Sequence, residues 1–171
     1  VWSQILKKVP NSNLILKSAD FCSDEMLLNK FKKNGVDTQI KILNKLDYVK
    51  KEDHLKVYNM IDLCLDTFPH NGVTTSFEAL WMGVPIIVLK GKNFCSRCGE
   101  SIMKNIKLNH LIADDLEDYI FKAVNFSKNL DNLTKIRDDL FESIPSSVLF
   151  DTKKFSDNFN NTLVEICKNQ N

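Results

Sequence analysis

Short apolar runs alternate with helix-forming segments along the first half of this chain, and that alternation limits the folds it can adopt. Each run is aliphatic and bounded by turn residues: Leu14 to Lys17, Ile40 to Leu43, Leu63 to Asp66 and Pro85 to Leu89. Continuous apolar runs of this length are typical of parallel strands that are buried on both faces. Strands separated by helices indicate βαβ units, so the sequence predicts an α/β fold with a parallel sheet flanked by helices.

Helices are predicted between these runs and through most of the second half of the chain. The first has Ser23 as its cap and stops at Gly35. A brief apolar run over 110–113 is compatible with a last strand. The 171 residues suit a single domain, so we expect one domain over 1–171, with a helical C-terminal tail from about residue 115. The predicted helices cover 23–35, 50–60, 74–83, 96–106, 114–128, 130–144 and 151–168.

Composition argues against several classes of partner. Lys and Arg number 23 against 22 acidic residues, and no basic block stands out, so no nucleic-acid partner is expected. No apolar run approaches the roughly 20 residues that cross a bilayer, which predicts a cytoplasmic protein without a membrane partner. The five cysteines are scattered and odd in number, which favours reduced thiols over a disulfide framework. Cys95 and Cys98 have ligand spacing but no second ligand pair, so no metal is expected.

The segment from Val1 to Pro10 is helical in pattern, yet no capping residue and no strand precede it. Since a doubly wound domain normally opens with a strand, we expect the first strand of the fold to lie outside this chain. In the order 3-2-1-4-5-6, that strand would separate the runs at 14–17 and 63–66. Unpaired edges then either pair with each other or recruit a second copy of the chain, and we expect the direct pairing.

The stretch from Asp66 to Thr75 carries a candidate anion site. A parallel strand that ends at Asp66 and a helix that begins at Thr74 place the helix N-terminus at the carboxyl edge of the sheet, where its unpaired N–H groups favour an anion. Gly72 allows the backbone to approach a bulky ligand, and the hydroxyls of Thr74 and Thr75 can donate to phosphate oxygens.

A structural interpretation of the same stretch stays open. Thr75 and Glu78 have the T-x-x-E spacing of a capping box, which would close the helix on itself, and Gly72 would then only make a turn. Two further expectations concern the neighbouring helices. Phe77, Leu80 and Trp81 should pack onto the sheet. Ser96 should cap the helix that follows, and the acidic pair at 114–115 should act as cap and dipole partners.

Several ordered motifs resemble one known family. The segments "LCLDTFPHNGVTTSFEALWMGVPIIVLKG", "SRCGESI" and "SSVLFDTKKF" are similar to the catalytic carboxy-terminal half of the O-linked N-acetylglucosamine transferase family, which includes bacterial members. The resemblance implies the second, Rossmann-like domain of a GT-B glycosyltransferase, which holds a UDP-sugar donor without a metal or other cofactor. It implies inverting transfer of N-acetylglucosamine or a related hexose to a protein or peptide acceptor. Because other domains contact that acceptor, this chain alone is expected to be inactive.

The resemblance also implies roles for individual residues. Thr74 and Thr75 would contact the donor pyrophosphate. Glu78 would bind the ribose hydroxyls, which suits a carboxylate that accepts two hydrogen bonds. His54 would stack on the uracil ring, with Lys51 as a nearby polar contact, although a solvated helix face would explain so charged a segment equally well.

One departure from the family pattern concerns the donor sugar. Val73 stands where the long, nucleocytoplasmic members carry a histidine and many bacterial members a glycine, so one phosphate or sugar contact is missing. That departure keeps a second function open, a non-catalytic nucleotide-binding or interaction module of the same fold. A different GT-B enzyme, such as a nucleotide-sugar epimerase, would need a catalytic acid near the anion site, and the sequence shows no candidate.

Overall fold

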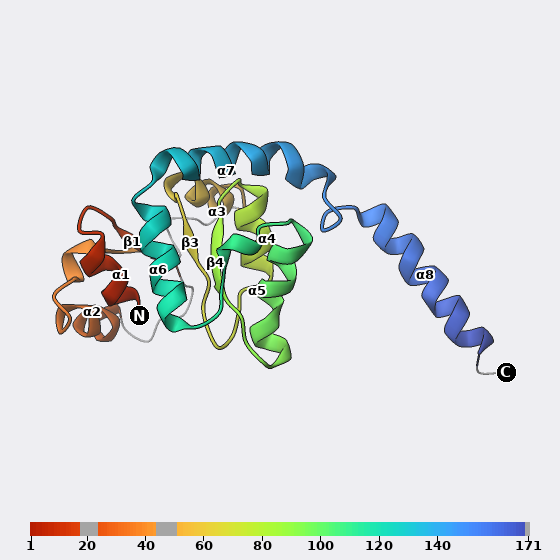
Figure 1. Ribbon diagram of the computed structural model, residues 1–171, viewed down its shortest axis with the longest axis horizontal. Coiled ribbons are helices and arrows are strands. Elements are labelled where there is room, and N and C mark those ends of the chain that lie inside the picture. Colours follow the sequence, from red (N-terminus) through yellow and green to blue (C-terminus); the bar gives the residue numbers. More distant parts are fainter. Residues whose placement is uncertain (18–23, 44–50, 170–171) are drawn as a thin grey trace.

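The computed structural model describes residues 1–17, 24–43 and 51–169, and its strands are those that the apolar runs predict (Figure 1). All strand pairs are parallel. One sheet joins β1 to β2, with Leu14 opposite Ile40, and the other has the order β3-β4-β5. The strands are β1 (Leu14–Lys17), β2 (Ile40–Leu43), β3 (Cys64–Leu65), β4 (Ile86–Leu89) and β5 (Ile112–Ala113).

Helices cover both faces of the three-stranded sheet, so the predicted α/β architecture is confirmed. In Figure 1, α6 lies on one face, α4 and α5 lie on the other, α7 runs across the top, and α8 extends away from the body. The α-helices are α1 (Trp2–Lys8), α2 (Asp24–Lys32), α3 (Lys51–Lys56), α4 (Thr74–Trp81), α5 (Phe94–Asn105), α6 (Leu116–Ser127), α7 (Leu130–Ser143) and α8 (Thr152–Lys168). Short 3-10 turns are η1 (Asp37–Gln39), η3 (Val57–Met60), η4 (Asn109–Leu111) and η5 (Ile144–Ser146).

The expected direct pairing of the runs at 14–17 and 63–66 is wrong. Among the described residues β1 pairs with β2 and β3 pairs with β4, and no ladder joins β1 to β3. The physical reason is that each sheet packs against its own apolar core, and α1 contributes to both. Ile5 belongs to the larger core and Leu6 to the smaller one, while Trp2 packs against both. The helix therefore joins the sheets through side chains.

The larger core is centred on β4, whose residues Ile86, Ile87 and Val88 are almost completely buried. Leu80 of α4 is fully buried against this core, which confirms its predicted packing. Phe77 packs at its margin. Trp81 departs from the expectation because it is 47% exposed and its ring lies 5.1 Å from that of Phe150, in the segment before α8.

The end of α4 requires a glycine. Gly83 has φ +72°, a left-handed conformation that ends the helix, and its N–H donates to the carbonyl of Leu80. A Cβ at this position would be strained by the backbone conformation and would lie 2.7 Å from the Phe141 ring, which would have to move.

The sequence predicts helix caps at Ser23, at Ser96 and in the acidic pair at 114–115, and Ser23 lies outside the described residues. The other two can be compared with the structure. Asp115 caps α6 by accepting a hydrogen bond from the Asp118 N–H, as expected. The expectation for Ser96 is wrong, because α5 starts two residues earlier and Asn93 is its N-cap. Ser96 instead occupies the third helical position, where its hydroxyl accepts from the Asn93 N–H at 3.0 Å. The cap was missed because an asparagine and a serine lie three residues apart, and both are good capping residues.

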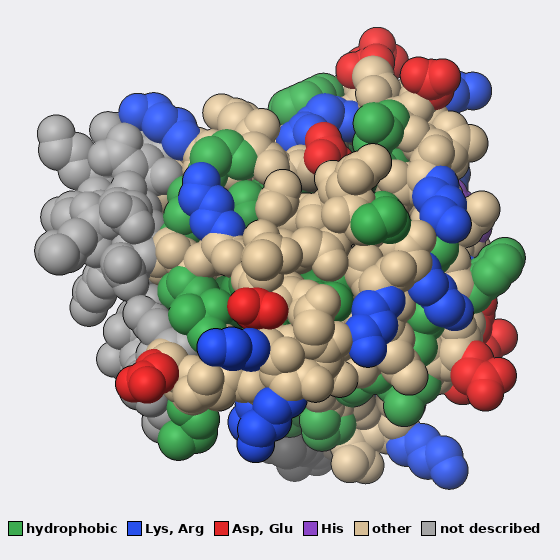
Figure 2. Space-filling view, turned by 90° about the vertical axis from the view of Figure 1, so that its left-hand side faces the viewer, with side chains coloured by type: hydrophobic (Ala, Val, Ile, Leu, Met, Phe, Trp, Pro, Cys, Tyr) green, Lys and Arg blue, Asp and Glu red, His purple; other side chains and the backbone are tan. Residues whose placement is uncertain are grey.

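The surface has charges of both signs. On the face that Figure 2 shows, lysine and arginine side chains lie singly or in small groups among acidic, polar and apolar ones. Within the described ranges no helix combines the length and apolar character needed to cross a membrane, and no group of three or more His, Cys, Asp or Glu could hold a metal ion. Four cysteines in these ranges are free thiols: Cys64, Cys95, Cys98 and Cys167.

Candidate functional site

The loop between β3 and α4 is organised by a buried carboxylate. Asp66 follows β3 and is only 7% exposed. Its Oδ1 accepts hydrogen bonds from the N–H of Gly72 at 2.8 Å and of Thr67 at 3.0 Å, so it draws both ends of the loop together. Burial raises its pKa to about 6, although these two N–H bonds oppose the rise. The sequence pattern marks Asp66 only as the end of a strand and gives no sign of this role.

Asn71 ties the same loop to α5. It is 1% exposed, its side-chain amide donates to the carbonyl of Thr67, and its Oδ1 accepts from the N–H of Gly99 at 3.2 Å. Its own N–H donates to the carbonyl of Cys95. These bonds fix the loop that precedes α4 against the first turns of α5.

The N-terminus of α4 has no side-chain cap, so the capping-box interpretation is wrong. The helix begins at Thr74 with Val73 as its N-cap residue, and no capping hydrogen bond from that side chain is present. Glu78, which the capping box would direct toward the helix start, points instead to α3 and η3. The first N–H groups of a helix have no acceptor within the helix, so this end of α4 can bind an anion.

The space that a side chain on Gly72 would need is occupied by the hydroxyl of Thr75. A Cβ on Gly72 would lie 2.4 Å from Thr75 Oγ1 and 3.3 Å from Asp66 Oδ1. The glycine therefore permits the Thr75 hydroxyl to lie against the loop at the start of the helix.

A second polar cluster joins α3 and η3 to α4. His54 Nε2 lies 2.8 Å from Glu78 Oε2, and the hydroxyl of Tyr58 donates to the same oxygen at 3.2 Å. Burial, followed by the charge of Glu78, raises the pKa of Tyr58. The structure thus brings together His54 and Glu78, which the resemblance assigned to the base and the ribose. Lys51 starts α3, but its side chain lies outside the described residues.

Lys17, at the end of β1, completes this cluster and was not predicted. Its Nζ lies 2.7 Å from His54 Nδ1, and it donates to the backbone carbonyl of His54 at 3.1 Å. No local signal could have identified it, because its partner lies 37 residues away in the sequence. The only available hint was its place at the carboxyl end of a predicted parallel strand.

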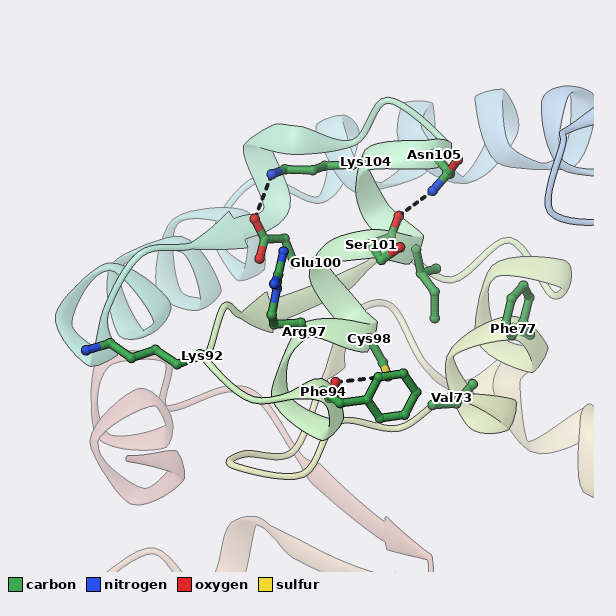
Figure 3. Close-up of a pocket in the computed structure, with 11 residues that line it drawn as sticks. Val73, Phe77, Lys92, Phe94, Arg97, Cys98, Glu100, Ser101, Lys104 and Asn105 are labelled. Carbon is green, nitrogen blue, oxygen red and sulfur yellow. Dashed lines mark hydrogen bonds and ion pairs between the residues drawn. The ribbon is translucent and has the colours of Figure 1, made fainter. Parts of the chain in front are cut away.

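A cavity of about 660 Å³ lies between α4 and α5 (Figure 3). Phe94, at the first position of α5, is 85% exposed at its margin, and Val73 is the lining residue that the cavity shares with the predicted site. The cavity therefore reaches the N-terminus of α4, but no side chain of the cluster around Glu78 lines it. Its lining residues are Val73, Phe77, Lys92, Phe94, Arg97, Cys98, Glu100, Ser101, Ile102, Lys104 and Asn105.

Comparison with known proteins identifies the family. Residues 1–159 match the model of glycosyl transferase family 41. The chain belongs to glycosyl transferase family 41. Two plant relatives carry the name probable UDP-N-acetylglucosamine–peptide N-acetylglucosaminyltransferase SPINDLY. The protein of Solanum lycopersicum is 34% identical over 161 residues, and that of Eustoma exaltatum subsp. russellianum 35% over 159.

These matches cover most of this chain but little of its relatives. The match to the Solanum lycopersicum protein covers 92% of this chain and the match to the Eustoma exaltatum protein covers 91%, but each covers only 17% of the plant protein. A UDP-N-acetylglucosamine–peptide N-acetylglucosaminyltransferase of Caenorhabditis elegans is 27% identical over 168 residues, or 98% of this chain and 14% of that protein. The chain therefore spans less than a fifth of the length of these family 41 relatives.

A solved family relative confirms the fold. The structure of an O-GlcNAc transferase mutant from Thermobaculum terrenum superimposes with a TM-score of 0.85 at 29% sequence identity. The match covers 99% of this chain and 34% of that one. The predicted resemblance to the O-linked N-acetylglucosamine transferases is thus confirmed for both sequence and fold.

Proposed function

We propose that this chain is the UDP-sugar-binding half of an inverting glycosyltransferase that transfers N-acetylglucosamine, or a related hexose, to protein side chains. The observation that carries the proposal is that His54 lies against Glu78 of α4, the helix whose N-terminus has no side-chain cap. The names of the family 41 relatives support the donor and the protein acceptor. The four free thiols fit a cytoplasmic protein.

The contacts of His54 favour stacking over proton transfer. Lys17 lies at one ring nitrogen and Glu78 at the other, so both polar positions on the edge of the ring are engaged. The His54 side chain is 32% exposed, and its face can lie against a base. Glu78 is 26% exposed and receives both of its hydrogen bonds at Oε2, so Oε1 can accept from the ribose hydroxyls.

The pyrophosphate belongs, in this proposal, at the N-terminus of α4. Its N–H groups and the hydroxyls of Thr74 and Thr75 would stabilise the diphosphate, whose negative charge grows as it leaves in a single in-line displacement. These donors would stabilise the charge that a metal ion stabilises in other transferases, so the proposal includes neither metal nor cofactor. In this proposal, the groups that contact and deprotonate the acceptor would lie in parts of the relatives that this chain does not span.

A non-catalytic nucleotide-binding module is the second candidate, and Val73 favours it. This apolar side chain is 45% exposed at the N-cap of α4, where a polar residue would add a phosphate or sugar contact. Both candidates bind UDP. Because the chain alone is expected to be inactive, the test joins it to the remaining catalytic parts of a family 41 relative, and release of UDP from a UDP-sugar by that fusion would rule out the non-catalytic module.

Nucleotide binding can be tested by NMR titration of the 171-residue chain. We expect UDP to bind weakly and to shift the amide resonances of Gly72, Thr74 and Thr75, because the pyrophosphate would approach the first turn of α4. ADP is the matched control, since it carries the same diphosphate on a different base. Equal shifts with ADP, or no shifts with UDP, would show that the uridine assignment is wrong.

Replacing Gly72 with alanine should weaken UDP binding about fivefold, the effect of losing one ordinary hydrogen bond. The new Cβ would displace the Thr75 hydroxyl from its place against the loop. The measurement is a calorimetric titration. The same substitution made in a Thr75→Ala background, where no hydroxyl remains to be displaced, should have no further effect. An additional loss there would mean that Gly72 acts through the backbone instead.

A further inference from the structure

Lys17 occupies a position from which a side chain can control the proposed nucleotide site. It is the last residue of β1, at the carboxyl end of a parallel strand. Its Nζ approaches both the ring and the backbone of His54, and it lies 5.8 Å from the centre of the Tyr58 ring. Burial lowers the pKa of Lys17, and the negative charge of Glu78 opposes that change. The lysine therefore faces the cluster rather than the solvent.

The contact between Lys17 and His54 fixes the proton on the ring. An ammonium group has three donors and no acceptor, so Nδ1 of His54 must accept the hydrogen bond from Lys17. A neutral imidazole that accepts at Nδ1 carries its proton on Nε2. That proton points at Glu78 Oε2, 2.8 Å away. One chain of hydrogen bonds therefore runs from Lys17 through His54 to Glu78.

We propose that Lys17 is a positioning residue for nucleotide binding, which holds the His54 ring in one tautomer and one orientation so that its face meets the base. Because His54 and Glu78 share a hydrogen bond, the same contact directs the Glu78 carboxylate toward the ribose. This inference rests on the proposed function only for the identity of the ligand. The contacts that join Lys17, His54 and Glu78 do not depend on a bound nucleotide.

The first test needs no nucleotide. Ring-nitrogen NMR spectra at pH ~8.5, where an ordinary imidazole is neutral, should show His54 protonated on Nε2, with the Nδ1 resonance displaced because it accepts a hydrogen bond. Lys17→Met removes the donor but keeps an unbranched side chain, so the Nδ1 resonance should move to the position of an unbonded nitrogen. Lys17→Arg should preserve the displacement, because a guanidinium can also donate. The three histidines can be assigned by replacing them one at a time.

The second test measures UDP affinity by calorimetry. Lys17→Met should weaken binding about three- to tenfold, within the range for one ordinary hydrogen bond, because the lysine acts on the nucleotide only through His54, and Lys17→Arg should restore much of the loss. Lys41→Met is the matched control, because Lys41 is an exposed lysine on the neighbouring strand β2, and it should change neither the ring spectrum nor the affinity.

The two measurements separate the possible failures. An unchanged Nδ1 resonance in Lys17→Met would overturn the proposal, because the lysine would then not hold the ring. A changed resonance with unchanged UDP affinity would also overturn it, since Lys17 would only join β1 to α3. If the unmodified chain bound no UDP, the proposed function would fail, and with it the role of Lys17 in nucleotide binding, while the ring spectra would still report the hydrogen bond.

Discussion

Replacing Glu78 with glutamine should weaken UDP binding by about 1.5 to 3 kcal/mol, which is a factor of about 10 to 150 in Kd. The amide keeps the shape of the side chain but accepts hydrogen bonds from the ribose without a negative charge. The free energy of unfolding should change by less than about 1 kcal/mol, because the amide oxygen can still accept from His54 and the side chain is partly exposed. Calorimetric titration with UDP and urea unfolding measure the two quantities.

Glu117→Gln is the matched control for this substitution. Glu117 is an exposed residue in the first turn of α6, on the opposite face of the β3–β4–β5 sheet from α4 (Figure 1). Its replacement should leave UDP affinity unchanged. If Glu78→Gln lowered the stability and left the affinity unchanged, Glu78 would be a structural link between α3 and α4 rather than a ligand for the ribose.

Between about pH 4 and pH 6 the free energy of unfolding should contain a contribution from Asp66 that falls as the pH rises, by up to about 3 kcal/mol. Burial raises the pKa of this carboxyl from 3.8 to about 6. Below about pH 4 the Asp66 carboxyl is protonated in both the folded and the unfolded chain, so its burial does not lower the free energy of unfolding there. As the pH rises toward 6 the unfolded chain releases its proton first and is favoured, and above about 6 the loss is complete.

The Asp66 contribution is isolated by comparing the chain with Asp66→Asn in urea unfolding at several pH values. Asparagine keeps an oxygen that can accept from the N–H groups of Gly72 and Thr67, but it carries no titrating proton. The stability difference between the two proteins should change across this pH range. Asp138→Asn, at an exposed position on α7, should follow the unmodified chain. A constant difference for Asp66→Asn would mean that the carboxyl titrates normally in the folded protein.

Strands could be predicted from the sequence because burial on both faces leaves a continuous apolar run. The bounds of β1 and β2 coincide with the predicted runs, and the glycines at 35 and 83 mark helix ends by their left-handed φ angles. These signals are local, since the residue type alone decides whether the backbone conformation is accessible.

Polar contacts between distant segments could not be predicted in this way. The Tyr119 hydroxyl donates to the carbonyl of Asp66, 53 residues away, and the Asn71 side chain accepts from Gly99, 28 residues away. The T-x-x-E spacing predicted a partner for Glu78 within its own helix, whereas the structure pairs it with His54, 24 residues away. Local motifs fail where a more distant partner competes for the same side chain.

The two apolar cores have a consequence for cooperativity. Within the part of the chain that the structure describes, only α1 supplies buried side chains to both, so we expect the small β1–β2 sheet and the larger sheet to lose their structure in separate steps. The proposed nucleotide site, however, takes Lys17 from the small sheet and Glu78 from a helix that packs on the large one. When the small sheet unfolds, Lys17 no longer holds the His54 ring, so a nucleotide would bind about three- to tenfold more weakly and its binding would oppose that step as well as the unfolding of the larger part. The donor would thus couple the two unfolding transitions, and the melting behaviour of the chain would itself report whether the site is occupied.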